Sequence, residues 1–198
     1  MEIYENFLRQ TVWSTGDATK FAGEWDGIKW RANVSITSAI VADGVVDLST
    51  GEDNEDGDEK GVFQWCTKLE TVRLPESLRK IGEKAFVYCE RLVHVNIPSG
   101  VNEIDEGAFA FSSLETVTIP EGVVNLSDGI FYKCKSLKSA KLPSSLKTIG
   151  DSAFDSCSAL TTINNDALEG VTEIGSYAFS QCKSLTILKW VRTLYINK

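Results

Sequence analysis

The stretch LKSAKLPSSLKTIGDSAFDSCSA, Leu137–Ala159, is the repeating unit of this protein, because similar copies of it recur along most of the chain. If its first leucine is position 1, the copies lie 22 to 25 residues apart and begin at Leu69, Leu92, Leu114, Leu137, Leu160 and Leu185. Apolar residues return at positions 1, 4, 6, 10 and 13, an Ala-Phe or Ile-Phe pair follows, and a cysteine or serine closes the unit. Agreement at so many columns indicates an internal repeat, and a period in the low twenties is typical of solenoid proteins.

The first half of the repeat predicts a strand that ends abruptly. Positions 3 to 6 alternate polar and apolar residues, which is typical of a strand with one buried face. Proline at position 7 cannot donate a ladder hydrogen bond, so it ends the strand and turns the chain. The chain's prolines all stand in this register: Pro75, Pro98, Pro120 and Pro143.

The second half of the repeat predicts a turn followed by a short helix. Gly82, Gly150 and Gly175 stand at position 14, where we expect a backbone geometry that other residues resist. In the Ala-Phe-x-x-Cys segment the Ala and Cys are four residues apart, which favours one helical turn with both on the same face. One unit cannot bury its apolar side alone, but stacked units form a continuous core.

These patterns predict an α/β solenoid, a right-handed superhelix with a parallel β-sheet on the concave face and short helical turns on the convex face. We expect three segments: an N-terminal α+β cap in residues 1–35, about six repeats in residues 36–190, and a C-terminal cap or strand in residues 191–198. The cap would contain a short amphipathic helix around Ile3–Val12 and a strand that alternates from Ile28 to Ile36. Its Trp13, Trp25 and Trp30 would cover the first repeat or, alternatively, form an aromatic platform for carbohydrate.

Residues 36–68 admit two interpretations. Asp43-Gly44 between two apolar runs is a hairpin signal. In contrast, the ADGVVDL stretch that contains it matches the later PEGVVNL in register, and Val62–Cys66 matches the Ala-Phe-x-x-Cys segment. We adopt the repeat interpretation, which makes this a first, irregular unit with an acidic insertion in residues 51–60.

The acidic insertion, GEDNEDGDEK, also has two interpretations. Glu52, Asn54, Asp56 and Asp58 follow the ligand spacing at the start of a calcium-binding EF-hand loop. However, Phe63 stands where such a loop has its bidentate glutamate, and no flanking helices are predicted. We therefore favour a solvated acidic loop and expect no metal site.

The cysteines and the lone histidine give little support for catalysis. The five cysteines fall in one column, which predicts a stack of buried thiols, and their odd number rules out complete internal pairing. No CxxC pair exists, so a zinc site is not expected, and neither is any other cofactor. His94 stands on a predicted strand with no nucleophile in a sequence context that would pair with it. We expect a protein that is not an enzyme.

Charge and hydropathy exclude further classes. A net charge of −8 opposes non-specific binding to nucleic acid and to anionic membranes. No apolar run is long enough for a membrane helix, so no membrane insertion is expected. The first residues, MEIYENFLRQ, do not follow the pattern of a signal peptide.

The repeat motif L-x-x-V-x-[IL]-P-x-x-[LV]-x-x-I-G-x-x-A-F-x-x-C resembles that of the BspA-like leucine-rich repeat family. The resemblance is clearest in Leu69–Cys89 and Leu137–Cys157, and the unit that starts at Leu160 departs from it by lacking the proline. Members of that family are often surface or secreted proteins, and several act in adhesion. The resemblance therefore implies an extracellular or cell-surface module that binds a protein, with host and matrix proteins as the expected partners. The alternative is a carbohydrate-binding or envelope-associated structural protein that uses the N-terminal tryptophans.

In such a solenoid the outer face of the sheet is the candidate binding surface. Side chains at positions 3 and 5 would point outward there, and none of them is acidic. We expect a polar or mildly acidic partner, although Thr and Asn are also simply common on solvated strands. The predicted partner-binding residues are Thr71, Arg73, His94, Asn96, Thr116, Thr118, Ser139, Lys141, Thr162, Asn164 and Lys189.

Overall fold

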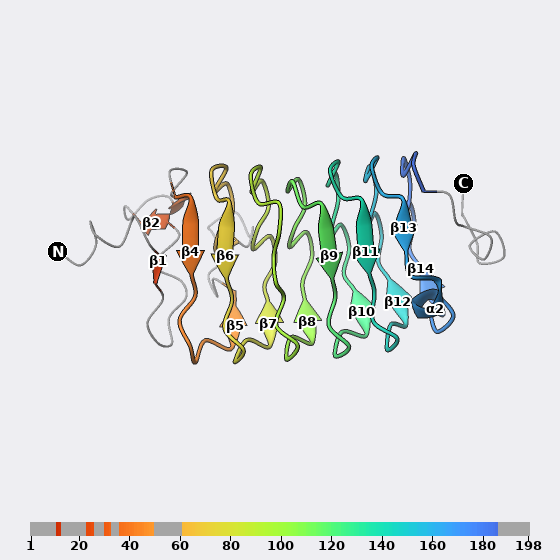
Figure 1. Cartoon of the computed structure of the whole chain (residues 1–198), viewed down its shortest axis with the longest axis horizontal. Coiled ribbons are helices and arrows are strands. Elements are labelled where there is room, and N and C mark those ends of the chain that lie inside the picture. Colours follow the sequence, from red (N-terminus) through yellow and green to blue (C-terminus); the bar gives the residue numbers. More distant parts are fainter. Residues whose placement is uncertain (1–10, 13–22, 26–29, 33–35, 50–60, 186–198) are drawn as a thin grey trace.

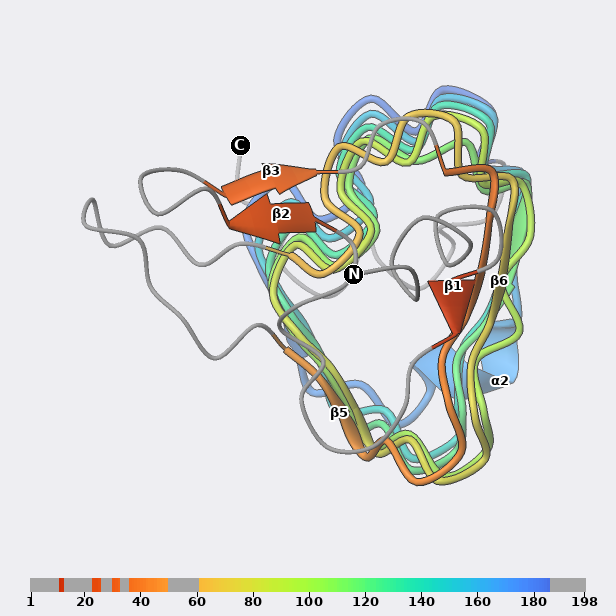
Figure 2. The same ribbon diagram turned by 90° about the vertical axis from the view of Figure 1, so that its left-hand side faces the viewer.

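A computed structural model describes residues 11–12, 23–25, 30–32, 36–49 and 61–185. Its coils stack side by side in a nearly straight row (Figure 1). Seen along that row, successive coils superpose into one closed outline, with strands on two of its sides and strand-free turns on the rest (Figure 2). The stacked coils confirm the predicted solenoid, but the nearly straight row does not show the concave and convex faces that were expected of a superhelix.

The first strand of most coils forms one set of parallel sheets. β4 pairs with β6, and β11 lies between β9 and β13, with parallel register throughout. Position 4 points into the core in this set, as shown by the buried Ala39, Val117 and Ala140. The strands are β4 (Ser38–Ile40), β6 (Thr71–Arg73), β9 (Thr116–Thr118), β11 (Ser139–Lys141) and β13 (Thr162–Ile163).

A second set of parallel strands lies on another side of the coils, where the repeat pattern predicts only a turn. These strands cover positions 12 and 13, where a polar residue precedes a buried apolar one in most coils, as in Lys80-Ile81. They pair in the orders β5-β7-β8 and β10-β12-β14. Their bounds are β5 (Asp47–Leu48), β7 (Lys80–Ile81), β8 (Glu103–Ile104), β10 (Asn125–Leu126), β12 (Thr148–Ile149) and β14 (Glu173–Ile174).

The predicted helical turn at Ala-Phe-x-x-Cys is wrong. Two residues per coil, four apart, have positive φ in this segment, as at Lys84 (φ 53) and Tyr88 (φ 59), and an α-helix cannot continue through them. Successive backbone amides in this segment alternate between a hydrogen bond to the next coil and a hydrogen bond within their own turn. Phe86 N donates to Ala108 O of the next coil at 2.7 Å, whereas Val87 N closes a local turn on Lys84 O at 3.0 Å. The segment is therefore a hydrogen-bonded ladder of turns.

A short helix is present at a different place from the one predicted. The helix α2 (Asn165–Leu168) lies in the unit that lacks the position-7 proline. In the preceding unit, Leu146 N donates to the carbonyl of Pro143, and Val171 N makes the equivalent bond to Leu168 O at 3.2 Å. The end of the helix thus takes over the corner that proline forms elsewhere.

The role predicted for the position-14 glycines is also wrong. Gly82, Gly150 and Gly175 are absent from the glycines with positive φ, so they do not supply an unusual backbone geometry. They are needed because the preceding coil is too close for a side chain. A Cβ atom on Gly175 would lie 2.5 Å from Asp151 N and 2.6 Å from Gly150 C, both of them backbone atoms.

The apolar columns form one continuous core, as predicted. Five phenylalanines, Phe63, Phe86, Phe109, Phe131 and Phe154, are completely buried, and their rings stack at centroid distances of 5.2 to 5.7 Å. Burying each such side chain contributes roughly 1.5–3 kcal/mol. Core columns become less buried at the last described coil, where Ile174, Phe179 and Leu185 are partly exposed.

Residues 36–49 form a coil of the solenoid and not a hairpin. β4 and β5 pair with strands of the next coil, and the turn at Asp43-Gly44 closes through a bond from Val45 N to Ala42 O. Before this coil, β1 (Thr11–Val12) pairs in parallel with β4, and β2 (Gly23–Trp25) pairs antiparallel with β3 (Trp30–Ala32). Of the N-terminal helix expected around Ile3–Val12, the structure describes only Thr11 and Val12, and these form a strand and not a helix.

The cysteine column consists of free, mostly buried thiols. Each of four thiols donates to the carbonyl of a phenylalanine in the preceding coil at 3.0 to 3.2 Å, and Ser112 Oγ contacts Cys134 Sγ at 3.3 Å. Burial raises the pKa of Cys66 to about 12 and the pKa values of Cys134 and Cys182 to about 11. All three are therefore weak nucleophiles at neutral pH.

We expect a thiol reagent such as DTNB to modify Cys182 first in the native protein, because it is the one cysteine that is only partly buried. The other four should react at the rate at which the chain unfolds. Time-resolved absorbance at pH 8 measures both phases, and Cys182→Ala should remove only the faster one. Rapid modification of several thiols in the folded wild type would contradict the buried column.

Candidate binding face

The strand face is defined here as the outward side chains at positions 3 and 5 of the first strand. Exposed members are Thr71, Arg73, His94, Asn96, Thr116, Thr118, Lys141 and Thr162, and the half-buried ones are Ser139 and Asn164. Parallel register brings neighbouring members together, since Ser139 lies between Thr116 and Thr162, and Lys141 lies beside Thr118. Lys189 lies outside the described residues. The structure thus places ten of the predicted residues on one surface.

Asn164 is already engaged within the chain. Its Oδ1 accepts a hydrogen bond from Leu142 N at 2.7 Å, and its Nδ2 donates to Leu142 O at 3.0 Å. The side-chain amide thus binds the backbone of the preceding coil at the end of the sheet. Asn164 is a positioning residue of the face and is less available to a partner than the sequence suggests.

The segment His94–Asn96 is not part of a sheet, although its coil contributes β8 to the second set of strands. Among the described residues, no backbone hydrogen bond joins His94, Val95 or Asn96 to a neighbouring coil. The nearest such bond runs from Glu115 N to Val93 O at 3.0 Å. The first-strand set is consequently divided into β1-β4-β6 and β9-β11-β13, and the peptide groups at the centre of the strand face are not used by the ladder.

Charges on the strand face differ from those at its margin. The side chains of Arg73 and Lys141 make no ion pair or hydrogen bond with any residue the structure describes. At the position-2 margin, Glu70 pairs with Arg91 at 3.3 Å, and Glu115 pairs with Lys138 at 2.8 Å. The Lys138 ammonium group lowers the pKa of the Glu115 carboxyl. Within the described part of the chain, the face therefore presents unpaired cations beside acids that are already ion-paired.

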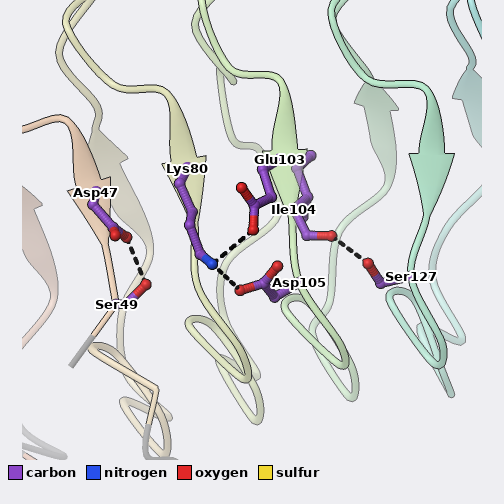
Figure 3. Close-up of polar contacts among 7 residues, drawn as sticks. All are labelled: Asp47, Ser49, Lys80, Glu103, Ile104, Asp105 and Ser127. Atoms are coloured by element: carbon purple, nitrogen blue, oxygen red, sulfur yellow. Dashed lines mark hydrogen bonds and ion pairs between the residues drawn. The ribbon is translucent and has the colours of Figure 1, made fainter. Parts of the chain in front are cut away.

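A second polar surface covers the strands β5, β7, β8, β10, β12 and β14. Lys80 Nζ lies 2.7 Å from Glu103 Oε1 and 2.9 Å from Asp105 Oδ2 (Figure 3). The two carboxylates raise the pKa of Lys80, while partial burial raises the pKa of Asp105 more than Lys80 lowers it. Beside this cluster, Ser127 Oγ donates to Ile104 O at 2.7 Å and bridges the two halves of the second set (Figure 3).

A row of exposed and half-buried aromatic rings lies along the turns and was also missed. Trp65, Tyr88 and Phe111 stand at one of the positive-φ positions, and their rings stack at centroid distances of 3.9 and 4.3 Å. Lys133 Nζ lies 5.2 Å from the Phe111 ring at the end of the row. The signal in the sequence was the recurrence of an aromatic residue just before the cysteine column. Tyr88 stacks between Trp65 and Phe111, so both faces of its ring are covered and cannot stack on a sugar.

Other predicted features gain no support as sites. The side chains of the proposed calcium ligands, Glu52, Asn54, Asp56 and Asp58, lie outside the described residues, as do those of Trp13, Trp25 and Trp30. Within the described ranges, no group of three or more His, Cys, Asp or Glu side chains is arranged to hold a metal ion. In the same ranges, no helix has the length and apolar character needed to cross a membrane.

Comparison with known proteins identifies the repeat. Residues 59–187 match the sequence family described as the BspA type leucine rich repeat region, in six copies. A search of curated proteins found no match.

Several solved bacterial structures share the fold. A T. pallidum leucine-rich repeat protein is 25% identical with a TM-score of 0.70, and the alignment covers 83% of this chain and 72% of that one. A leucine-rich cell surface protein from Faecalibacterium prausnitzii is 29% identical with a TM-score of 0.60, and a Bacteroides ovatus leucine-rich repeat protein is 26% identical with a TM-score of 0.53. These two alignments cover 90% and 74% of this chain but only 41% of each relative.

Proposed function

Because the chain belongs to the BspA-type leucine-rich repeat family, we propose that it is a non-catalytic interaction module that binds a protein partner on the strand face. The observation that carries this proposal is the composition of that face. Its described exposed side chains are uncharged or basic, and Arg73 and Lys141 have no ion-pair partner among the residues that the structure describes, although the whole chain has a net charge of −8. A surface whose charge is opposite to that of the surrounding protein favours specific partners.

The proposal extends to the location of the protein. One structural relative is described as a leucine-rich cell surface protein. We place this chain at the cell surface or outside the cell, where a host or matrix protein is the candidate partner. Nucleic acid is not a candidate, because a strongly acidic chain lacks the positive field that phosphate binding requires.

Site-specific photo-crosslinking tests which face binds. A benzoylphenylalanine at Thr118 samples the strand face, and the same residue at Val124, which is 42% exposed, samples the second polar surface. We expect one protein from cell-surface and matrix preparations to cross-link through position 118 and not through 124. The purified partner should then bind the wild-type chain saturably. Equal capture at both positions, or capture at 124 alone, would refute a strand-face interaction.

Carbohydrate binding is the alternative function and can be tested on the same protein. A glycan array probed with the full chain would show saturable binding if the N-terminal tryptophans form a sugar platform. Under our proposal, any glycan binding on the array should be unchanged in Trp13→Ala and in Trp30→Ala. Loss of glycan binding in these variants, with a normal melting temperature, would favour the alternative.

A further inference from the structure

The two unpaired cations of the strand face are aligned along the solenoid. Arg73 and Lys141 both stand at position 5, and the residues between them in that column are Asn96 and Thr118. They are thus three coils apart. Neighbouring strands lie about 4.8 Å apart, so the two cations are separated by about 14 Å along the row of coils.

Acids flank this column on both sides but not within it. Glu70 and Glu115 lie at the position-2 margin, where Arg91 and Lys138 neutralise them. On the other margin, beyond the prolines, Glu76 and Glu121 are exposed. Glu121 accepts hydrogen bonds from Ser144 N and Ser144 Oγ. A negatively charged partner is therefore favoured over the column and disfavoured at the proline margin, which restricts it to a narrow line along the solenoid.

The spacing of the cations distinguishes an extended partner from a helical one. An extended chain rises about 3.3 Å per residue, so residues i and i+4 are about 13 Å apart and point to the same side. A helix rises about 1.5 Å per residue and needs about nine residues to span the same distance, which places the two ends on opposite sides of the helix. An extended chain with carboxylates at i and i+4 therefore matches the spacing of Arg73 and Lys141 most closely.

The centre of the column can bind the backbone of such a chain. The side-chain amide of Asn96 and the side-chain hydroxyl of Thr118 are exposed there. These groups are hydrogen-bond donors and acceptors without charge. They suit the peptide backbone between two acidic anchors.

We infer that the strand face binds an extended acidic polypeptide segment laid along the solenoid axis, with two carboxylates about four residues apart that contact Arg73 and Lys141. This inference rests on the proposed function and adds the chemistry, direction and spacing of the partner. The partner is a segment of another protein and not an isolated anion, because two charges at a fixed distance are recognised.

Fluorescence anisotropy with labelled synthetic peptides tests the inference on the full chain. The probes are nine-residue Ser/Thr-rich peptides whose two glutamates stand two, three, four, five or six positions apart, with a glutamine version of the four-position peptide. We expect the four-position glutamate peptide to bind most tightly and to weaken with added salt. Its glutamine version should bind about tenfold more weakly or not at all.

Two double variants locate the contact. Arg73→Gln with Lys141→Gln should weaken binding of the four-position peptide about tenfold. Arg79→Gln with Lys147→Gln is the control, because these two exposed cations stand at position 11, just before β7 and β12, and are also three coils apart. Unlike Arg73 and Lys141, both donate hydrogen bonds to backbone carbonyls of the chain. The control should bind like wild type, and melting temperatures verify that both variants fold.

The outcomes separate this inference from the proposed function. No binding, binding that ignores the glutamate spacing, or an equal loss in the control variant would overturn the acidic-segment inference. If a partner still cross-links through position 118, the interaction module stands without the inferred chemistry. If cross-linking occurs only through position 124, the proposed function fails, whatever the peptides show.

Discussion

Phe109→Ala is expected to lower the free energy of unfolding by about 3–5 kcal/mol, the typical cost of removing a large aromatic side chain from a packed core. Phe109 is completely buried, and its ring stacks between those of Phe86 at 5.2 Å and Phe131 at 5.7 Å. The substitution therefore leaves a cavity and breaks two aromatic contacts. Because each coil contacts only its neighbours, nothing distant can fill the gap.

Urea denaturation followed by circular dichroism measures this loss. Val124→Ala is the control, since Val124 is 42% exposed on the second polar surface and should change stability by about 0.5 kcal/mol or less. A solenoid interrupted in the middle is also expected to unfold over a broader range of urea, with the two halves less coupled. A loss below about 1 kcal/mol for Phe109→Ala would show that the phenylalanine column is not the main support of the stack.

Gly150→Ala is expected to destabilise the protein by about 3 kcal/mol, even though alanine suits the local backbone better than glycine does. A Cβ atom there would collide with Asp128 Oδ1 and lie 2.7 Å from Asp128 N. The same carboxylate oxygen accepts a hydrogen bond from Asp151 N at 2.7 Å, so the methyl group also displaces a contact between coils. The adjacent coils must move apart to admit it.

Gly107→Ala separates this steric effect from backbone strain. Gly107 has φ +60, but the nearest atom to an added Cβ is Lys84 Cγ at 3.6 Å. The expected cost is about 1 kcal/mol, because other coils place Lys84 and Ser152 in the same conformation at this position. Thermal melting of both variants gives the comparison. If Gly107→Ala proves the more damaging of the two, the close approach of coils at Gly150 is not what requires glycine.

The repeat columns predicted the core because burial depends on a period that the sequence displays directly. Leu69, Leu92, Leu114 and Leu137 are completely buried, and the strand that precedes each proline lies where alternation put it in most coils. The same columns predict that Arg73 and Lys141 lie on one surface, as they do in the structure. Whether that surface binds a partner stays a prediction.

What failed depended on backbone geometry that residue types do not reveal. A spacing of four between Ala85 and Cys89 fits a helical turn, but it fits equally well a ladder in which Lys84 and Tyr88 take positive φ. Glycine at position 14 signals either an unusual φ or a close neighbour, and only the neighbouring coil shows that the second applies. The missing ladder bonds at His94–Asn96 have no counterpart in the sequence, where this unit looks regular.

The α2 corner shows where this architecture accepts foreign sequence. The unit from Leu160 is longer than its neighbours, yet β13 before the helix still pairs with β11, and β14 after it still pairs with β12. Extra residues at the corner therefore leave hydrogen bonding intact on both sides. An engineered epitope, tag or second binding loop inserted beside the exposed Asp166 would be carried at the rim of the strand face and could widen what the module recognises, provided that Asn164 and the buried Ala167 keep their places.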